Sequence, residues 1–174
     1  PHRARVLADL RAAGITRLVV NGSSELDWPD VTALCASSTQ LSALHPQLLP
    51  SYGLHPWDVG NRTANWQTAL LAHLDANPAA ALGEIGLDRW IIDSARPDDP
   101  RLAGLRRAPL DEQIEVFTWQ LTLAAQRNLP ASVHCLEAFG PLLDTLRTTP
   151  LPARGFLLHA YNGSTQMAKN FADL

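Results

Sequence analysis

The chain has 174 residues, 46% of them hydrophobic, and a formal net charge of −3. This length and composition suit a chain that buries a core of its own, so we expect one domain over residues 1–174. The negative balance excludes a protein that coats nucleic acid with an overall positive surface. The longest apolar runs are far shorter than the ~20 residues of a membrane-spanning helix.

Two cysteines, Cys35 and Cys135, are too few for the disulfide framework of a secreted domain. The chain begins at Pro1 without an initiator Met, and no apolar signal stretch follows. We therefore expect a cytoplasmic protein with no membrane contact and no obligatory protein partner. We also expect a chain that is processed, trimmed or a fragment.

Apolar residues recur with helical and strand periods in alternation along the chain. Val6 and Leu10 share one helical stripe that Gly14 ends, and the β-rich run after it ends at Asn21-Gly22. In chain order, the pattern predicts a helix at 5–13, a strand at 15–20, a helix at 27–38, a strand at 49–54, a helix at 65–75, a strand at 79–84, a helix at 110–127, a strand at 131–134, a helix at 138–147, a strand at 155–159 and a helix at 164–174. Residues 89–109 form the one long irregular stretch.

Strands that are separated by single helices pair in parallel, because each crossover returns the chain to the same end of the sheet. Such a pattern fits a doubly wound sheet or a barrel. A complete (β/α)₈ barrel needs a strand before the first predicted helix and about two more after the last, in keeping with its usual ~250 residues. We therefore predict an α/β chain of the (β/α)₈ TIM-barrel type, here lacking the first strand and the last strands.

Four of the five predicted strands end on a side chain that can bind a metal or transfer a proton, and only the strand ending at Asn21 does not. These residues are His55, Glu84, His134 and His159. A single histidine at a strand end is more often a hydrogen-bonded core or rim residue than a ligand. In a parallel barrel, however, all these ends share one rim, where active sites lie. Imidazoles and a carboxylate are typical ligands of Zn²⁺, Mn²⁺ or Fe, and can also serve Mg²⁺.

The same residues lie in motifs of a known family. These motifs are Gly53-Leu54-His55-Pro56, Gly83-Glu84-Ile85-Gly86-Leu87-Asp88, the stretch 113–134 that ends in Val133-His134, and His159-Ala160-Tyr161-Asn162-Gly163. In their order and spacing, they resemble the TatD-type metal-dependent hydrolases, over nearly the whole chain. The resemblance implies a TIM barrel of the metallo-dependent hydrolase superfamily and a deoxyribonuclease activity.

The resemblance also implies a ligand set. Glu84 bridges two divalent ions (Mg, Mn or Zn) in a complete enzyme, and His134 and His159 complete the shell of one of them. In the family, the other ion takes a His-x-His pair and a late Asp, and this sequence contains neither. Either the chain is truncated or it is a degenerate, non-catalytic member. We favour truncation, because barrel strands are missing together with the ligands, and we expect this chain to be weak or inactive as it stands.

The expected mechanism is attack on phosphorus by a metal-activated water. Asp88, placed in a loop after Glu84, is a candidate catalytic residue that orients a ligand or the water, or else a turn-capping residue. His55 resembles the family's rim histidine near the substrate, or else is structural.

Arg89 and Trp90 begin the irregular stretch and are candidates for contact with DNA, through a phosphate and a stacked base. Alternatively, the stretch is a solvated insertion with Trp90 packed on the barrel. Trp57 and the remaining tryptophans are interpreted as packing residues.

Three functions remain open from the sequence. The first is a TatD-type phosphodiesterase with DNA as substrate. The second is a metal-dependent hydrolase of small amides or cyclic amides on the same barrel, although the version that uses a modified lysine is disfavoured because Lys169 is the only lysine. The third is a non-catalytic binding scaffold.

Overall fold

The computed structural model describes residues 2–39 and 46–174. The strands are β1 (Arg17–Asn21), β2 (Gln47–Tyr52), β3 (Ala81–Asp88), β4 (Ala131–Leu136) and β5 (Phe156–Leu158). The helices are α1 (His2–Ala12), α2 (Trp28–Thr39), α3 (Trp66–Ala76), α4 (Trp90–Asp93), α5 (Leu110–Arg127), α6 (Phe139–Thr148) and α7 (Thr165–Ala172), with short 3₁₀ turns at Val59–Asn61 (η1) and Pro100–Leu102 (η2).

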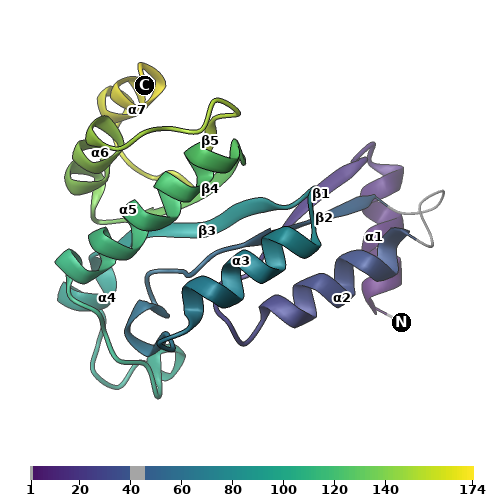
Figure 1. Ribbon diagram of the computed structural model, residues 1–174, viewed down its shortest axis with the longest axis horizontal. Coiled ribbons are helices and arrows are strands. Elements are labelled where there is room, and N and C mark those ends of the chain that lie inside the picture. The colour runs from purple at the N-terminus through teal and green to yellow at the C-terminus, as the bar shows by residue number, and fades with distance from the viewer. Residues whose placement is uncertain (1, 40–45) are drawn as a thin grey trace.

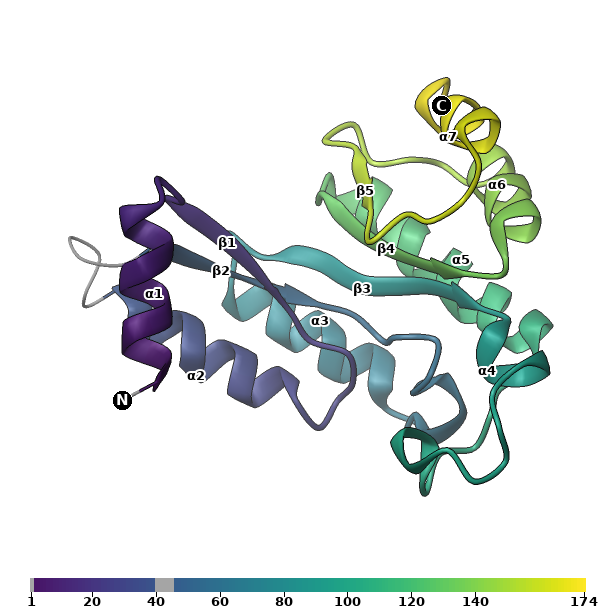
Figure 2. The ribbon, with the colours of Figure 1, turned by 180° about the vertical axis from the view of Figure 1, so that it is seen from behind.

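The five strands form one sheet in the order β1-β2-β3-β4-β5, and every neighbouring pair is parallel. Helices α2, α3 and α5 lie along one face of this sheet (Figure 1), and in the view from behind the strands lie in front of them (Figure 2). Successive strands joined by helices on one face are the arrangement of a (β/α) barrel wall. The predicted fold class is therefore confirmed as an α/β half-barrel.

The main core fills the space between the sheet and its helices, because each helix presents an apolar stripe to the strands. Its fully buried members include Tyr52, Leu70, Leu82, Leu121 and Leu142. A second, smaller cluster contains Ile91, Ala95 and Leu102, and Trp57 and Trp90 pack against it. Among the described helices, none is both long and apolar enough to cross a membrane.

Two predictions about the middle of the chain were wrong. The strand expected to end at Glu84 continues to Asp88, so Asp88 is the last residue of β3 and not a loop residue. The stretch 89–109, expected to be irregular, contains α4 and η2. The strand is longer because Gly86, Leu87 and Asp88 continue to pair with β4. Within the stretch, the side chain of Asp88 accepts from the N–H of Ile91 in α4, and that of Asp99 accepts from the N–H of Arg101 in η2.

Gly86 sets the distance between β3 and β4. It pairs with His134 in the parallel register, and its φ of +141° is rarely adopted by residues with a side chain. A Cβ at this position would lie 2.0 Å from the carbonyl oxygen of His134. Glycine is therefore required for the strands that carry Glu84 and His134 to approach each other.

Candidate metal centre

The strand ends bring together two of the three predicted metal ligands, Glu84 and His134, and with them His55, which was predicted to lie near the substrate. One ligand atom from each of His55, Glu84 and His134 lies within 4.8 Å of the other two. Oε1 of Glu84 lies 3.1 Å from Nδ1 of His134 and 3.7 Å from Nε2 of His55, and the two imidazole rings are 4.4 Å apart between centroids. These residues come from β3, from β4 and from the segment just after β2.

A register shift in β3 turns Glu84 toward this cluster. Leu82 pairs with Ala131 and Ile85 pairs with Val133, so β3 has one residue more than β4 between these two pairs. The irregularity is a β-bulge, which commonly redirects a side chain next to a functional site. The peptide N–H of Glu84 is left free of β4 and donates instead to the carbonyl of Gly22, after β1.

Asp88 lies behind His134 and is fully buried. Its Oδ2 is 3.1 Å from Nε2 of His134 and accepts a 2.6 Å hydrogen bond from Nε1 of Trp57, while Oδ1 accepts from the N–H of Ile91 in α4. The hydrogen bond from Ile91 is the capping role that the sequence analysis gave as the alternative for Asp88. The same carboxylate therefore both begins α4 and orients His134.

Two glutamines of α5 hold the segments that carry His55 and Asp88. Oε1 of Gln120 accepts from the N–H of Leu54 at 2.8 Å, and its Nε2 donates to the Leu54 carbonyl. Gln113 makes the same pair of contacts with the peptide groups of Asp88. Both glutamines are fully buried. Because their amides satisfy backbone groups at the strand ends, α5 determines where His55 and Asp88 lie.

The charges in the cluster are strongly coupled. Burial alone would lower the pKa of His134, but hydrogen bonds to Asp88 and Glu84 and the charges of both carboxylates raise the pKa to about 9. Burial, the largest single cause, raises the pKa values of Glu84 and Asp88. Their hydrogen bonds and the neighbouring imidazole charges together outweigh burial, so both pKa values lie below the ordinary one. Burial and the neighbouring His134 lower the pKa of His55 to about 4.

The structure places His159 directly after β5, where its N–H donates to the carbonyl of Val133 at 2.8 Å. Its side chain is exposed, and among the described residues it does not join the cluster of His55, Glu84 and His134. His159 is nevertheless near enough for its charge to lower the pKa values of both His55 and Glu84.

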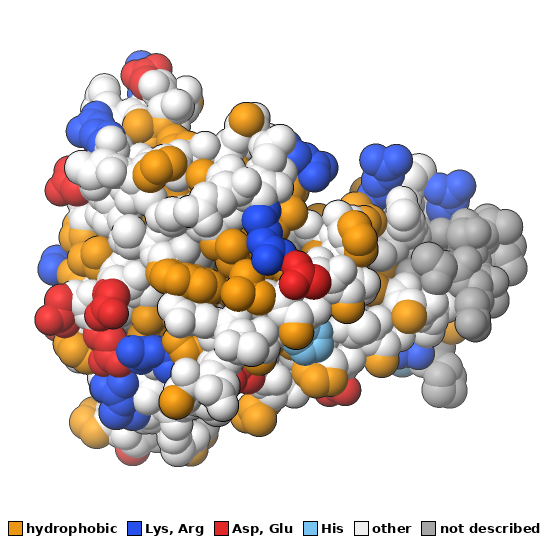
Figure 3. Space-filling model, in the orientation of Figure 1, with side chains coloured by type: hydrophobic (Ala, Val, Ile, Leu, Met, Phe, Trp, Pro, Cys, Tyr) orange, Lys and Arg blue, Asp and Glu red, His pale blue; other side chains and the backbone are white. Residues whose placement is uncertain are grey.

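The residues predicted to contact DNA lie at the start of α4. The guanidinium of Arg89 pairs with Asp93 one helical turn later, at 3.6 Å and half exposed. Trp90 stacks on Trp57 with ring centroids 6.0 Å apart, and the guanidinium of Arg101 lies 5.0 Å from the Trp90 ring. Trp90 also packs against the small cluster of Ile91, Ala95 and Leu102, and its predicted role in substrate binding stays a prediction. Basic and acidic side chains are interspersed over this region of the surface (Figure 3).

Trp57 is the site residue that the sequence reasoning missed. It was interpreted as a packing residue, yet its indole donates to Asp88 and its backbone N–H donates to Nδ1 of His55 at 3.2 Å. The available signal was its position two residues after His55, directly after the Gly53-Leu54-His55-Pro56 motif. The sequence could not supply the partner, because Asp88 is 31 residues away.

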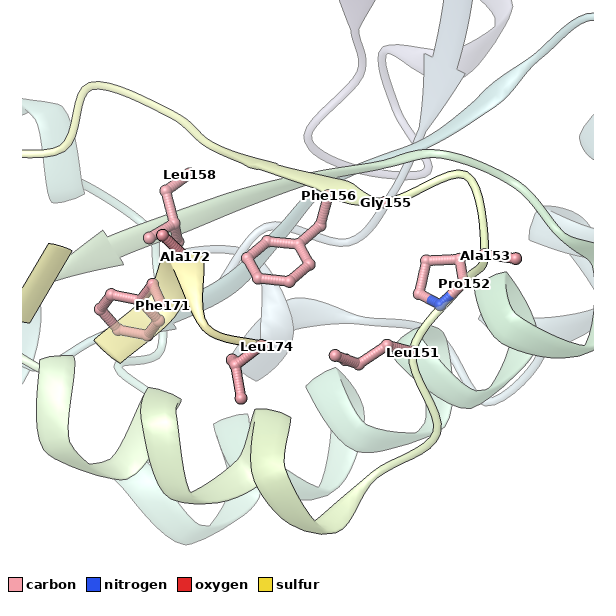
Figure 4. Close-up of a pocket in the computed structure, with 9 residues that line it drawn as sticks. All are labelled: Leu151, Pro152, Ala153, Gly155, Phe156, Leu158, Phe171, Ala172 and Leu174. Atoms are coloured by element: carbon pink, nitrogen blue, oxygen red, sulfur yellow. The ribbon is translucent and has the colours of Figure 1, made fainter. Parts of the chain in front are cut away.

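A separate hollow of about 650 Å³ lies beside β5 and α7 (Figure 4). It is lined by apolar side chains, among them Leu151, Phe156 and Phe171. Because its walls carry no histidine or carboxylate side chain, this hollow offers no ligand for a metal.

The parallel sheet, with its carboxylate and imidazoles at the strand ends, is the half-barrel of a TatD-type fold with a candidate metal cluster at one rim. Two solved structures share the fold: YjjV, a TatD homologue from Escherichia coli K12, with a TM-score of 0.75 and 27% identity over 99% of this chain and 59% of that one, and a TatD-family hydrolase from Entamoeba histolytica, with a TM-score of 0.79 and 16% identity over 98% and 53%.

The chain belongs to the family of TatD-related DNases, whose model matches residues 1–174. It is 28% identical to an uncharacterized metal-dependent hydrolase of Haemophilus influenzae, over 98% of this chain and 60% of that protein. It is 27% identical to a protein of a Pantoea species named 3'-5' ssDNA/RNA exonuclease TatD, over 94% and 55%. The chain thus spans between half and two thirds of the length of these relatives.

Proposed function

We propose that this chain carries part of the active site of a divalent-metal-dependent phosphodiesterase that hydrolyses DNA, with single-stranded DNA as its preferred substrate. The observation that carries the proposal is the convergence of Glu84 and His134, from different strands, with His55 beside them. Membership of the TatD-related DNases supports it. The name of the Pantoea relative supports single-stranded nucleic acid as the substrate class.

The residues fit a divalent ion by their chemistry. A carboxylate oxygen and imidazole nitrogens suit Mn²⁺ or Zn²⁺, and Mg²⁺ when oxygens predominate. We propose that Glu84 and His134 hold one ion, that His159 joins them from β5, and that a complete enzyme holds two ions bridged by Glu84. When bound, such an ion lowers the pKa of a water molecule and stabilises negative charge on phosphoryl oxygens.

Asp88 prepares His134 for this role. A ligand histidine must be neutral and must direct a lone pair at the metal. When His134 is neutral and its Nε2 donates its hydrogen to Asp88, the lone pair of Nδ1 is directed toward Glu84. A carboxylate behind a ligand histidine is a common arrangement that fixes its tautomer. We therefore propose that Asp88 is a positioning residue that orients the ligand His134, the first of the two roles considered for it, and that it acts from the end of β3 and not from a loop.

His55 is oriented for a different task. Nδ1 of His55 accepts the backbone N–H of Trp57, and its low pKa keeps the ring neutral at pH 7. A neutral imidazole has only one N–H, so the hydrogen lies on Nε2, which faces Glu84. A nitrogen that carries a hydrogen donates and does not ligate. We propose that His55 donates this hydrogen bond to a phosphoryl oxygen of the substrate.

Arg89 is the proposed phosphate contact beyond His55. It directly follows Asp88 in the chain, and its guanidinium is half exposed beside Asp93. Trp90 contacts Trp57 and Arg101, which supports a role in forming the surface next to Arg89. A base of the substrate would stack on the part of the Trp90 ring that these two residues do not cover.

Calorimetric titration with Mn²⁺ tests the ligand assignment. We expect Glu84→Gln, His134→Ala and His159→Ala each to weaken Mn²⁺ binding more than tenfold, and His55→Ala to weaken it less. His73→Ala is the matched control, because His73 packs against Trp28 and Tyr52. If His134→Ala binds Mn²⁺ as tightly as the wild type, the metal assignment is wrong.

Hydrolysis of a labelled single-stranded oligonucleotide tests the reaction. Because the chain contains no His-x-His segment, we expect slow turnover that requires Mn²⁺ and disappears in Glu84→Gln. Turnover that persists in EDTA, or in the Glu84→Gln variant at the wild-type rate, would contradict a metal-dependent phosphodiesterase.

A further inference from the structure

Asn21 ends β1, the strand whose end carries no predicted ligand. Its side-chain oxygen Oδ1 is buried and, within the described part of the chain, has no hydrogen-bond partner. A buried acceptor without a donor is unfavourable and is rare in native proteins, so such an atom calls for an explanation. The usual explanation is that the unpaired atom contacts a water molecule, an ion or a ligand.

The backbone around Asn21 is tied to the candidate metal centre. The carbonyl of the next residue, Gly22, accepts the N–H of Glu84 at 3.0 Å, and the carbonyl of Ser23 accepts the N–H of His55 at 2.8 Å. The segment that leaves β1 is therefore hydrogen-bonded to Glu84, a proposed ligand of the ion, and to His55 beside it. Asn21 directly precedes Gly22 and Ser23, the two residues that make these contacts.

The alternation of side chains places Asn21 on the same face of the sheet as His134. In β1, Leu18 and Val20 pack against the main core under the helices, so Val19 and Asn21 project from the opposite face. In β4, Val133 and Cys135 belong to the core, so His134 projects from the opposite face as well. Both strands are parallel, and both residues lie toward their carboxyl ends.

We propose that Asn21 is a further residue of the metal centre: its amide oxygen accepts a hydrogen bond from a water molecule that accompanies a divalent cation held by Glu84 and His134. An amide oxygen suits this role because it accepts without carrying charge, and water is the donor that hydrated divalent ions bring into a site. Asn21 is thus a positioning residue, and the inference rests on the proposed function.

The test compares Asn21→Leu, which has a similar size and no acceptor, with Asn21→Asp, which retains an acceptor oxygen. The probe is Mn²⁺ alone, titrated by calorimetry, and thermal unfolding is measured in EDTA. We expect Asn21→Leu to bind Mn²⁺ about tenfold more weakly, as for other partners outside the first ligand shell. Without metal, its Tm should stay the same or rise by a few degrees, because an unsatisfied acceptor is removed. Asn21→Asp should bind at least as tightly as wild type.

Asn77→Leu is the matched control, because the Asn77 amide donates to the His73 carbonyl at the end of α3, before β3 begins. We expect it to lower Tm and leave Mn²⁺ binding unchanged. A merely structural Asn21 would behave like this control. The proposal is overturned if Asn21→Leu binds Mn²⁺ like the wild type or fails to fold. If the wild type itself binds no Mn²⁺, the proposed metal centre fails, and with it the basis of this inference.

Discussion

The indole Nε1 of Trp57 donates a hydrogen bond of 2.6 Å to Oδ2 of the buried carboxylate of Asp88. Trp57 follows β2 and Asp88 ends β3, so this bond links the ends of two strands. Beyond Asp88, the chain of contacts continues to His134 and then to Glu84. The orientation of His134 therefore depends on a residue that lies outside the metal centre.

We expect Trp57→Phe to lower the free energy of unfolding by about 1–3 kcal/mol, because a buried carboxylate loses a hydrogen-bond donor. Trp90→Phe is the control, since it removes the stacked partner of Trp57 without removing a bond to Asp88. Urea denaturation in EDTA measures the free energy of unfolding of both variants. Equal losses in the two variants would mean that aromatic packing, and not the bond to Asp88, carries the effect.

The stability of the metal-free protein should fall as the pH rises from about 6.5 to about 9. The pKa of His134 is about 9 in the folded chain and 6.5 for the ordinary side chain, so the contribution of its ion pairs is complete below pH 6.5 and is lost as the pH passes through 9. Thermal unfolding in EDTA across this window checks the slope. His134→Gln should flatten it, and a wild-type curve that is flat over this window would contradict the raised pKa.

Mn²⁺ binding should strengthen with pH over the same range, by up to about tenfold per unit below pH 9. The reason is that His134 must lose a proton before Nδ1 can present a lone pair, and the neighbouring carboxylates oppose that loss. Calorimetry in two buffers with different ionisation enthalpies measures the released proton. Identical heats in both buffers would show that no proton leaves and that His134 is not a ligand.

Gly86→Ala should destabilise the protein by about 2–4 kcal/mol, because the new Cβ would clash with the carbonyl oxygen of His134 and the φ of +141° is unfavourable for alanine. Gly140→Ala is the control: Gly140 lies in α6, and nothing is within 4 Å of an added Cβ. This control should be neutral or slightly stabilising. Chemical denaturation compares them, and equal stability of both variants would show that β3 and β4 do not need the close approach.

Much of the fold could be predicted because its signals are local. The alternation of helical and strand periods indicated five parallel strands, and the structure confirms their number and order among the described residues. The strand at 131–134 could be placed because Val133 alternates with its polar neighbours. The family was also recognisable from short motifs, and the family comparison confirms it. That residues 1–174 form a single domain stays a prediction.

The roles of individual site residues were harder to predict. Asp88 was assigned to a loop because the strand was expected to end at Glu84. Nothing nearby in the sequence revealed Gln113, 25 residues later, as the partner that satisfies the backbone of Asp88. The metal-binding role of Glu84, His134 and His159, and the substrate role of His55, Arg89 and Trp90, stay predictions that the experiments above address.

By itself, the sequence determined which segments form strands and placed His55, Glu84, His134 and His159 in or next to them, since the period of side chains along a strand depends only on neighbours in the chain. Only the tertiary structure decided how those residues meet. The contacts of His134 with Glu84 and Asp88, the bond from Trp57 to Asp88 and the unsatisfied oxygen of Asn21 all depend on groups that are distant in the chain. Their partners are set by sheet register and close packing, which no local pattern of residues encodes.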